Sequence, residues 1–127
     1  MRTPREVSES YWAAECRRDL DTVMAHYLPD ATYQDGAGLL VGDTAIRGYY
    51  EASIAAYPGL EVEILREFTR SADTSAFEVH AVLTDHDGNR SIIEGLIAIT
   101  VRDGRMASIR CYEDPLRPES TGGEAAQ

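Results

Sequence analysis

Lysine is absent from this sequence, and all twelve basic residues are arginines scattered along the chain. Aspartate and glutamate together number 22, which gives a formal net charge of −10. A nucleic-acid partner is therefore not expected, because phosphate binding needs a basic face. An acidic surface of this kind mainly keeps a protein in solution.

Long apolar runs are also missing. No run approaches the roughly 18 residues that indicate a membrane helix. The first ten residues, MRTPREVSES, contain no apolar signal core. We expect a cytoplasmic protein with no membrane partner.

The sequence offers few groups for a metal or a nucleotide cofactor. Cys16 and Cys111 lack the spacing of a disulfide framework. His80 and His86 flank a turn without the third ligand that zinc would need. No glycine-rich phosphate loop opens a helix, so chemistry without a cofactor or a metal fits best.

What is present is a pattern of helices followed by strands, in a length of 127 residues that suits one domain. Thr3, Pro4 and Glu6 form a capping box for a first helix. The apolar spacing restarts after Asp19, and Pro29 ends it. Two abutting helices and one bent helix both remain open.

The stretch 31–50 organises the rest of the chain. A β-prone run, 31–34, leads to Asp35 in a glycine-punctuated loop, and Asp43 is expected to cap a helix that ends before Pro58. Strands are expected at 60–69, 75–84, 91–101 and 106–112. The fold class is therefore α+β, with one curved antiparallel sheet packed against the helices. We assign residues 1–116 to this single domain and 117–127 to a disordered tail.

Several short motifs, taken in their order and spacing, resemble the SnoaL-like branch of the nuclear transport factor 2-like superfamily. They are Asp19-Leu20-Asp21, the run 30–35, Gly42 with Ile46, Glu94-Gly95, the run 101–105, and Tyr112-Glu113-Asp114. The resemblance covers residues 5–116. It implies an α+β cone that encloses one deep apolar pocket, and a homodimer.

The resemblance to ketosteroid isomerase, one member of this superfamily, places Tyr11 on the tyrosine of its oxyanion hole. Asp35 falls on its proton-shuttling base. The protonated aspartic acid that provides the second oxyanion donor is replaced by Leu96 or Ile97. Losing such a donor costs on the order of a hundredfold in rate, so steroid isomerisation itself is not the activity we expect.

The resemblance to limonene epoxide hydrolase places Tyr33 and Asp35 on residues that hold the nucleophilic water. Asp114 falls on the carboxylate of the last strand. An arginine and an aspartate complete the site of limonene epoxide hydrolase. The corresponding residues here are Glu78 and His80, so the Asp-Arg-Asp relay that activates water is broken. SnoaL-type polyketide cyclases likewise use pocket aspartate and histidine residues without a metal.

These comparisons leave one candidate catalytic set, consisting of Asp35, His80 and Asp114 with Tyr33 beside them. If His80 points into the cone, its strand neighbours Phe77 and Val79 pack on the other side of the sheet. Titratable groups in one apolar pocket can divide into an acid and a base. The candidate substrate-binding residues are Tyr11, Trp12, Tyr50, Glu78 and Glu94.

Structural roles remain open for the same residues. Asp35 could serve only the turn before glycine, Asp114 could cap the end of its strand, and His80 could be a hydrogen-bonded structural residue. Glu94 is either a pocket acid or an interface residue paired with an arginine such as Arg110.

The leading hypothesis is a cofactor-independent enzyme that moves protons on a hydrophobic small molecule, by isomerisation or by ring closure of the polyketide or terpenoid type. Asp35 would be the base, Asp114 and His80 the acid and its orienter, and Tyr11 or Tyr33 the oxyanion donor. Epoxide hydrolysis or epoxide-opening cyclisation is one alternative, and a non-catalytic binding module is another. A cone filled by bulky side chains would favour the last.

Overall fold

The computed structural model describes residues 2–119. In chain order its elements are α1 (Pro4–Cys16), α2 (Leu20–Met24), β1 (Tyr27–Asp35), β2 (Gly38–Val41), α3 (Asp43–Ala56), β3 (Gly59–Thr69), β4 (Thr74–Thr84), β5 (Arg90–Arg102), β6 (Arg105–Glu113) and β7 (Arg117–Pro118). The predicted α+β class is confirmed. Within residues 2–119, no helix has both the length and the apolar character needed to cross a bilayer.

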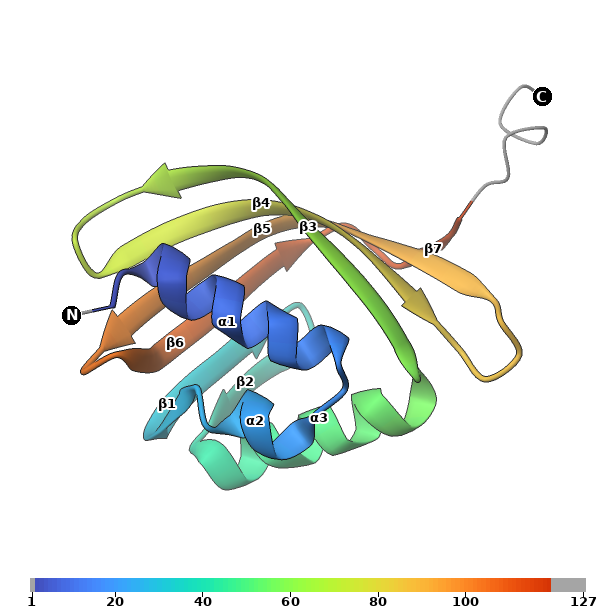
Figure 1. Ribbon diagram of the computed structural model, residues 1–127, viewed down its shortest axis with the longest axis horizontal. Coiled ribbons are helices and arrows are strands. Elements are labelled where there is room, and N and C mark those ends of the chain that lie inside the picture. The colour runs from blue at the N-terminus through green and yellow to red at the C-terminus, as the bar shows by residue number, and fades with distance from the viewer. Residues whose placement is uncertain (1, 120–127) are drawn as a thin grey trace.

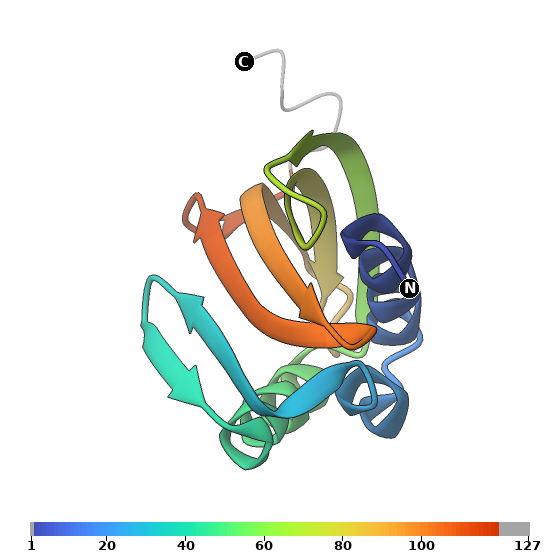
Figure 2. The same cartoon turned by 90° about the vertical axis from the view of Figure 1, so that its left-hand side faces the viewer.

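One curved sheet and three helices form the molecule (Figure 1). The strand order is β2-β1-β6-β5-β4-β3, and β7 pairs with β5. All these pairs are antiparallel except β1 with β6, which is parallel and departs from the wholly antiparallel sheet that was expected. Figure 2 shows the sheet curling from β3 round to β2, with the helices closing its open side.

The two N-terminal helices are separate, which decides between the alternatives left open by the sequence. The capping box is present, because the Thr3 hydroxyl accepts the N–H of Glu6 at 3.1 Å and the Glu6 carboxylate accepts the N–H of Thr3 at 2.9 Å. After α1, Arg18 adopts a left-handed backbone with φ of 55°. Asp19 then caps α2 by accepting the N–H of Thr22 at 3.3 Å.

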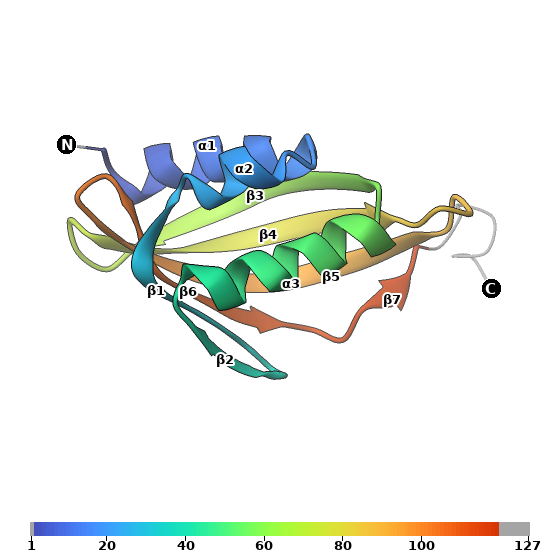
Figure 3. The same cartoon turned by 90° about the horizontal axis from the view of Figure 1, so that it is seen from below.

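The stretch after Ala31 contains one strand that the sequence did not reveal. The expected glycine-rich loop forms a hairpin in which β2 pairs back on β1, with Asp35 opposite Gly38. The N-cap of α3 is Gly42 with φ of 89°, a conformation that favours glycine, and Asp43 is the first helical residue instead of the cap. Figure 3 shows α3 lying along the sheet next to this hairpin.

The chain also stays in the sheet beyond the expected domain boundary at residue 116. Arg117 and Pro118 pair with Ile92 and Ser91 of β5. The N–H of Glu119 donates to the carbonyl of Arg90 at 2.9 Å. The remainder of the expected tail, residues 120–127, lies outside the described part of the chain.

Alternation along β4 fixes which side chains face the interior. Phe77, Val79 and Ala81 are buried and face the helices, whereas Glu78 and His80 between them are only half-buried. Side chains of a strand alternate between the two faces of a sheet. Glu78 and His80 therefore lie on the outer face of the sheet.

Candidate active site

An apolar cavity of about 110 Å³ lies between α1, α3 and the concave face of the sheet. We call it the inner cavity. Its wall is built from α1, α3 and strands β1 and β3 to β6, and consists of Tyr11, Trp12, Glu15, Tyr33, Tyr49, Tyr50, Ser53, Leu60, Val62, Val79, Ala81, Leu83, Ile93, Ile97, Ile109, Cys111 and Glu113. Four predicted site residues line it: Tyr11, Trp12, Tyr33 and Tyr50. The cone is therefore hollow, as the resemblance implied.

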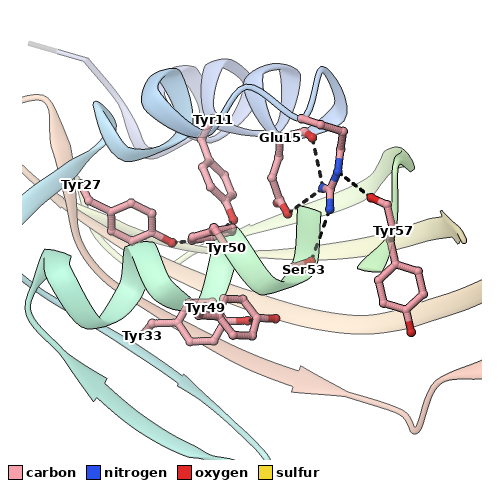
Figure 4. A network of polar contacts seen from close by, with 9 residues as sticks. Tyr11, Glu15, Tyr27, Tyr33, Tyr49, Tyr50, Ser53 and Tyr57 are labelled. Atoms are coloured by element: carbon pink, nitrogen blue, oxygen red, sulfur yellow. Dashed lines mark hydrogen bonds and ion pairs between the residues drawn. The ribbon is translucent and has the colours of Figure 1, made fainter. Parts of the chain in front are cut away.

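Three buried tyrosines form a hydrogen-bonded chain against this cavity (Figure 4). The hydroxyl of Tyr50 lies at the centre, 2.6 Å from that of Tyr27 and in close contact with that of Tyr11. Their rings pack edge-on or tilted, at centroid distances of 5.9 to 6.2 Å. Burial raises the pKa of all three tyrosines, so each hydroxyl keeps its proton and can donate it in a hydrogen bond.

Glu15 places a carboxyl group in the same cavity. It follows Tyr11 by four residues, so the two side chains share one face of α1. Burial raises the pKa of Glu15, although a hydrogen bond from Tyr11 and the charge of Arg18 both oppose this rise. A carboxyl group with a raised pKa stays protonated up to a higher pH and can therefore act as an acid.

Arg18 joins the end of α1 to α3 behind Glu15. Its Nη1 lies 3.6 Å from a carboxylate oxygen of Glu15, and its Nε donates to the carbonyl of Tyr57 at 3.0 Å. Nη2 also donates to the hydroxyl of Ser53 at 3.4 Å. Only 8% of the Arg18 side chain is exposed. The left-handed backbone at Arg18 directs this side chain inward, where it contacts Glu15, Ser53 and Tyr57.

Glu113 supplies a second carboxyl from the end of β6. It lies on the same strand face as Ile109 and Cys111, and all three line the inner cavity. Partial burial raises the pKa of Glu113, and the negative charge of Asp35 raises it further. The like charge of Glu113 in turn helps to raise the pKa of Glu15. The cavity thus contains two carboxyl groups with raised pKa, one deep and one near solvent.

Gly95 permits the position of Glu113. The two residues are paired between β5 and β6. A Cβ atom on Gly95 would overlap the carbonyl oxygen of Tyr112 and lie 2.6 Å from the Cα of Glu113. Glycine is therefore required here for the close approach of β6, and not for an unusual backbone angle.

Asp35, the residue singled out first by the sequence, lies beside the inner cavity. It is half-buried at the end of β1 and borders two neighbouring grooves. Its carboxylate accepts the N–H of Ala37 at 2.8 Å, which is the turn role that the sequence left open. Its charge nevertheless acts on the pKa of Glu113. Asp35 is therefore a neighbour of the cavity wall and not part of it.

Tyr33 and Tyr49 form the wall on the Asp35 side. Their ring centroids are 4.6 Å apart with a 35° tilt, and the Tyr33 hydroxyl donates to that of Tyr49 at 3.0 Å. The thiol of Cys111 donates to the Tyr33 hydroxyl at 3.7 Å. Burial raises the pKa of Tyr49 and of Cys111 to about 12 in each case. The thiol is therefore protonated near neutral pH.

Four predicted site residues lie on the outer face of the sheet, away from the inner cavity. Glu78, Glu94 and Asp114 border a shallow groove there. His80 bonds Glu94 through Nδ1 at 3.1 Å, and Glu94 also accepts from Arg117 at 2.7 Å. The expected grouping of Asp35, His80 and Asp114 in one pocket is thus not what the structure shows. The physical reason is the alternation of β4 and β6, which directs Val79 and Glu113 inward and their neighbours outward.

Glu94 has the paired arrangement that the sequence left open, with Arg117 as its partner in place of Arg110. Arg110 instead lies over the ring of Tyr112, 5.5 Å from its centroid. The pKa of Glu94 is lowered by its hydrogen bonds from Arg117 and His80. The ion pair between Arg117 and Glu94 is largely exposed to solvent, and ion pairs of this kind contribute little to stability.

Glu15, Tyr27, Tyr49 and Glu113 were not predicted as site residues from the sequence. Two local signals could have found the carboxyl groups. Glu15 stands one helical turn after Tyr11, and Glu113 continues the inward alternation of Ile109 and Cys111. No local pattern joins Tyr27 to Tyr50, because only the folded chain brings them together.

Solved structures with the same fold include several enzymes. Ketosteroid isomerase from Mycobacterium sp. superposes with a TM-score of 0.83 at 17% identity, over 93% of this chain and 100% of that one. An epoxide hydrolase resembling limonene epoxide hydrolase, from M. tuberculosis, superposes with a TM-score of 0.75 at 24% identity, over 85% of this chain and 80% of that one. SalBIII is an epoxide hydrolase/cyclase-like enzyme in pyran ring formation of the polyether salinomycin. It superposes with a TM-score of 0.79 at 18% identity, over 91% of this chain and 95% of that one.

At these identities the likeness establishes the fold alone, and it confirms the predicted α+β cone. No curated protein matches the chain. The family model described as the SnoaL-like domain matches residues 8–109. That match covers most of the chain, which therefore belongs to the SnoaL-like domain family.

Proposed function

We propose that this chain is a cofactor-independent acid–base enzyme that isomerises or cyclises a hydrophobic small molecule of the polyketide or terpenoid type. One observation carries the proposal. Tyr11 and Tyr50, two members of the hydrogen-bonded tyrosine chain, line the same apolar cavity as two carboxyl groups with raised pKa. Proton transfer needs both a base near the carbon that loses a proton and donors near the oxygen that gains charge.

In this mechanism the substrate carbonyl oxygen accepts a hydrogen bond from Tyr11. The Glu113 carboxylate removes a proton from the carbon beside the carbonyl, and the electron pair of that C–H bond moves to the oxygen. Tyr11 stabilises the resulting enolate, with its hydroxyl backed by Tyr50 and Tyr27. A positioned base contributes roughly 10²–10⁴ in rate, and one oxyanion donor about 10²–10³.

Two outcomes are then open to the enolate. In an isomerisation, Glu113 returns the proton at a different carbon of the conjugated system. In a ring closure, the enolate carbon bonds to a second carbonyl carbon of the same molecule, and the oxygen of that carbonyl takes the proton from Glu113. Both routes restore Glu113 as a carboxylate, so no other reactant is consumed.

Asp35 has a supporting role in this proposal. Its negative charge raises the pKa of Glu113, which makes Glu113 a stronger base once it is ionised. From the sequence, Asp35 itself was the expected base. We assign that role to Glu113, because Glu113 lines the inner cavity and Asp35 does not.

A small β,γ-unsaturated ketone, 3-cyclohexen-1-one, suits the test because its single ring matches a compact cavity. We expect the protein to convert it to the conjugated enone, and to incorporate deuterium when the reaction is run in ²H₂O. Tyr11→Phe should lower kcat/KM about 100-fold, since it removes the donor to the enolate oxygen. Absence of turnover in the wild type, or full turnover by Tyr11→Phe, would refute the proposed chemistry.

A second candidate function is epoxide opening, which the pair Glu15 and Glu113 favours. Glu15, with its raised pKa, could protonate the epoxide oxygen while the Glu113 carboxylate takes a proton from water or from an internal hydroxyl. Incubating 1,2-epoxycyclohexane in H₂¹⁸O tests the hydrolytic form. A labelled diol would support this function, whereas unchanged epoxide alongside conversion of the ketone would favour proton transfer.

We also propose that the chain forms a homodimer through the outer face of its sheet. Large apolar side chains are exposed there, with Leu65, Phe68, Leu96 and Tyr112 each at least 40% exposed. A patch of this kind on a soluble domain favours protein contact. Light scattering should give twice the chain mass for the wild type and the single mass for Leu96→Asp. A monomeric wild type would disprove the dimer and leave the proposed chemistry intact.

A further inference from the structure

A second groove lies directly behind one wall of the inner cavity. It measures about 190 Å³ and runs between α3 and the β1–β2 hairpin. We call it the hairpin groove, and its lining is Tyr33, Asp35, Ala37, Gly38, Leu39, Leu40 and Tyr49. Tyr33 and Tyr49 line both spaces. The stacked pair of rings, labelled in Figure 4, is therefore the partition between them.

The two rings of this partition are held unequally. Tyr33 is 5% exposed and also packs edge-on against Tyr50, with centroids 6.1 Å apart. Tyr49 is 38% exposed; it stacks on Tyr33, shares one hydroxyl bond with it and packs edge-on against Tyr50, with centroids 5.3 Å apart. A single hydrogen bond of this type is worth only about 1 kcal/mol net. Because Tyr49 is the solvent-exposed ring of the pair, it is the one with space to move aside.

The two spaces differ in chemistry. The inner cavity has the groups suited to a reacting carbonyl, namely Tyr11, Glu15 and Glu113. The hairpin groove is mostly apolar, and Leu40 faces it from the same side of the hairpin as Tyr33, with which it is paired. An apolar cavity of about 150 Å³ is enough to bind benzene, so the inner cavity of about 110 Å³ suits at most one ring.

We propose that the hairpin groove binds the apolar tail of the substrate, and that Tyr49 swings aside to join the two spaces. The substrate class is then an elongated hydrophobic carbonyl compound of at least two rings. Its carbonyl-bearing ring lies in the inner cavity, and its second ring lies between Tyr49 and Leu40. This inference rests on the proposed function, because that function places the carbonyl end in the inner cavity.

Two phenols that resemble an enol test the inference by calorimetric titration of the intact chain. Phenol can fill only one of the two spaces, and its hydroxyl favours the inner cavity with Tyr11 and Glu15, whereas 4-phenylphenol has a second ring in line with the first. We expect the wild type to bind 4-phenylphenol at least 10-fold more tightly. Leu40→Gln, which makes the groove polar at similar side-chain volume, should lower this ratio at least fivefold and leave the Kd of phenol unchanged. Val41→Gln is the matched control, because Val41 is exposed on the same strand but does not line the groove.

A second variant keeps the test decisive if Leu40→Gln is poorly folded. Tyr49→Phe retains the ring and removes the hydroxyl bond, so it should speed the association of 4-phenylphenol and not that of phenol. If phenol binds and the second ring adds nothing, or if Leu40→Gln and Val41→Gln behave alike, the hairpin groove is not a binding site and the proposed function stands. If neither phenol binds, the inference and the proposed function both fail.

Discussion

Glu113 and Asp114 are neighbours in the chain, and they lie on opposite faces of the sheet. Glu113 lines the inner cavity, while Asp114 borders the shallow groove on the outside. The N–H of Asp114 donates to the carbonyl of Glu94 at 2.9 Å, which holds the end of β6 against β5. Two carboxylates one residue apart therefore have separate environments, and only one of them can meet a ligand in the cavity.

Asp35→Asn should move the pH dependence of activity to lower pH. Burial raises the pKa of Glu113 above its ordinary value of 4.5, and the charge of Asp35 raises it further. Without that charge Glu113 loses its proton more easily, so the active carboxylate is present at lower pH. A profile of kcat/KM against pH measures this as a downward shift of the acid limb. An acid limb that stays in place would mean that Asp35 does not influence the base.

Tyr50→Phe should be more destabilising than Tyr27→Phe. Tyr50 bonds both Tyr11 and Tyr27, so its loss leaves two buried hydroxyls without this partner. A buried polar group left unpaired costs about 1–3 kcal/mol. Tyr27→Phe removes a terminal hydroxyl and keeps the bond between Tyr11 and Tyr50. Urea denaturation at pH 7 gives both free energies of unfolding, and equal losses would show that Tyr50 is not the centre of the network.

Gly95→Ala should lower kcat without unfolding the protein. The added methyl group would overlap the end of β6 at Tyr112 and press on Glu113. A displacement of about 1 Å in a catalytic group can cost roughly 100-fold in rate. The binding of phenol should stay within twofold, since the cavity wall near Tyr11 is unaffected. Gly36→Ala is the control, because no atom lies within 4 Å of the position of its added Cβ, and unchanged kcat in both variants would contradict the role of Gly95.

The sequence predicted the fold class and four of the aromatic residues that line the inner cavity, Tyr11, Trp12, Tyr33 and Tyr50. Three local patterns each correspond to an observed element. They are the capping box at Thr3, the helical apolar spacing that restarts after Asp19, and the apolar alternation in 75–84. Tyr11 was predicted from the resemblance to ketosteroid isomerase, and Tyr50 lies at helical spacing among the apolar residues that follow Asp43. The β1–β2 hairpin was missed, since β2 has only four residues and three of them are exposed.

The acidic part of the site could not be obtained in the same way. In a strand, an alignment error of one residue exchanges the two faces of the sheet. Placing the last carboxylate by family likeness gave Asp114 in place of Glu113, and the same ambiguity placed His80 in the pocket. The direction of each side chain decides between such neighbours, and that direction is fixed by strand pairings such as Gly95 with Glu113 and His80 with Glu94.

Comparison of Glu113→Gln with Asp114→Asn tests the central claim most directly, with kcat/KM for 3-cyclohexen-1-one as the measurement. Both variants replace a carboxylate by its amide at adjacent positions, so differences in local folding are small. We predict that Glu113→Gln loses at least 100-fold, as expected for removal of a general base, and that Asp114→Asn stays within twofold of the wild type. A large loss in Asp114→Asn with activity retained in Glu113→Gln would contradict the assignment of the inner cavity as the active site.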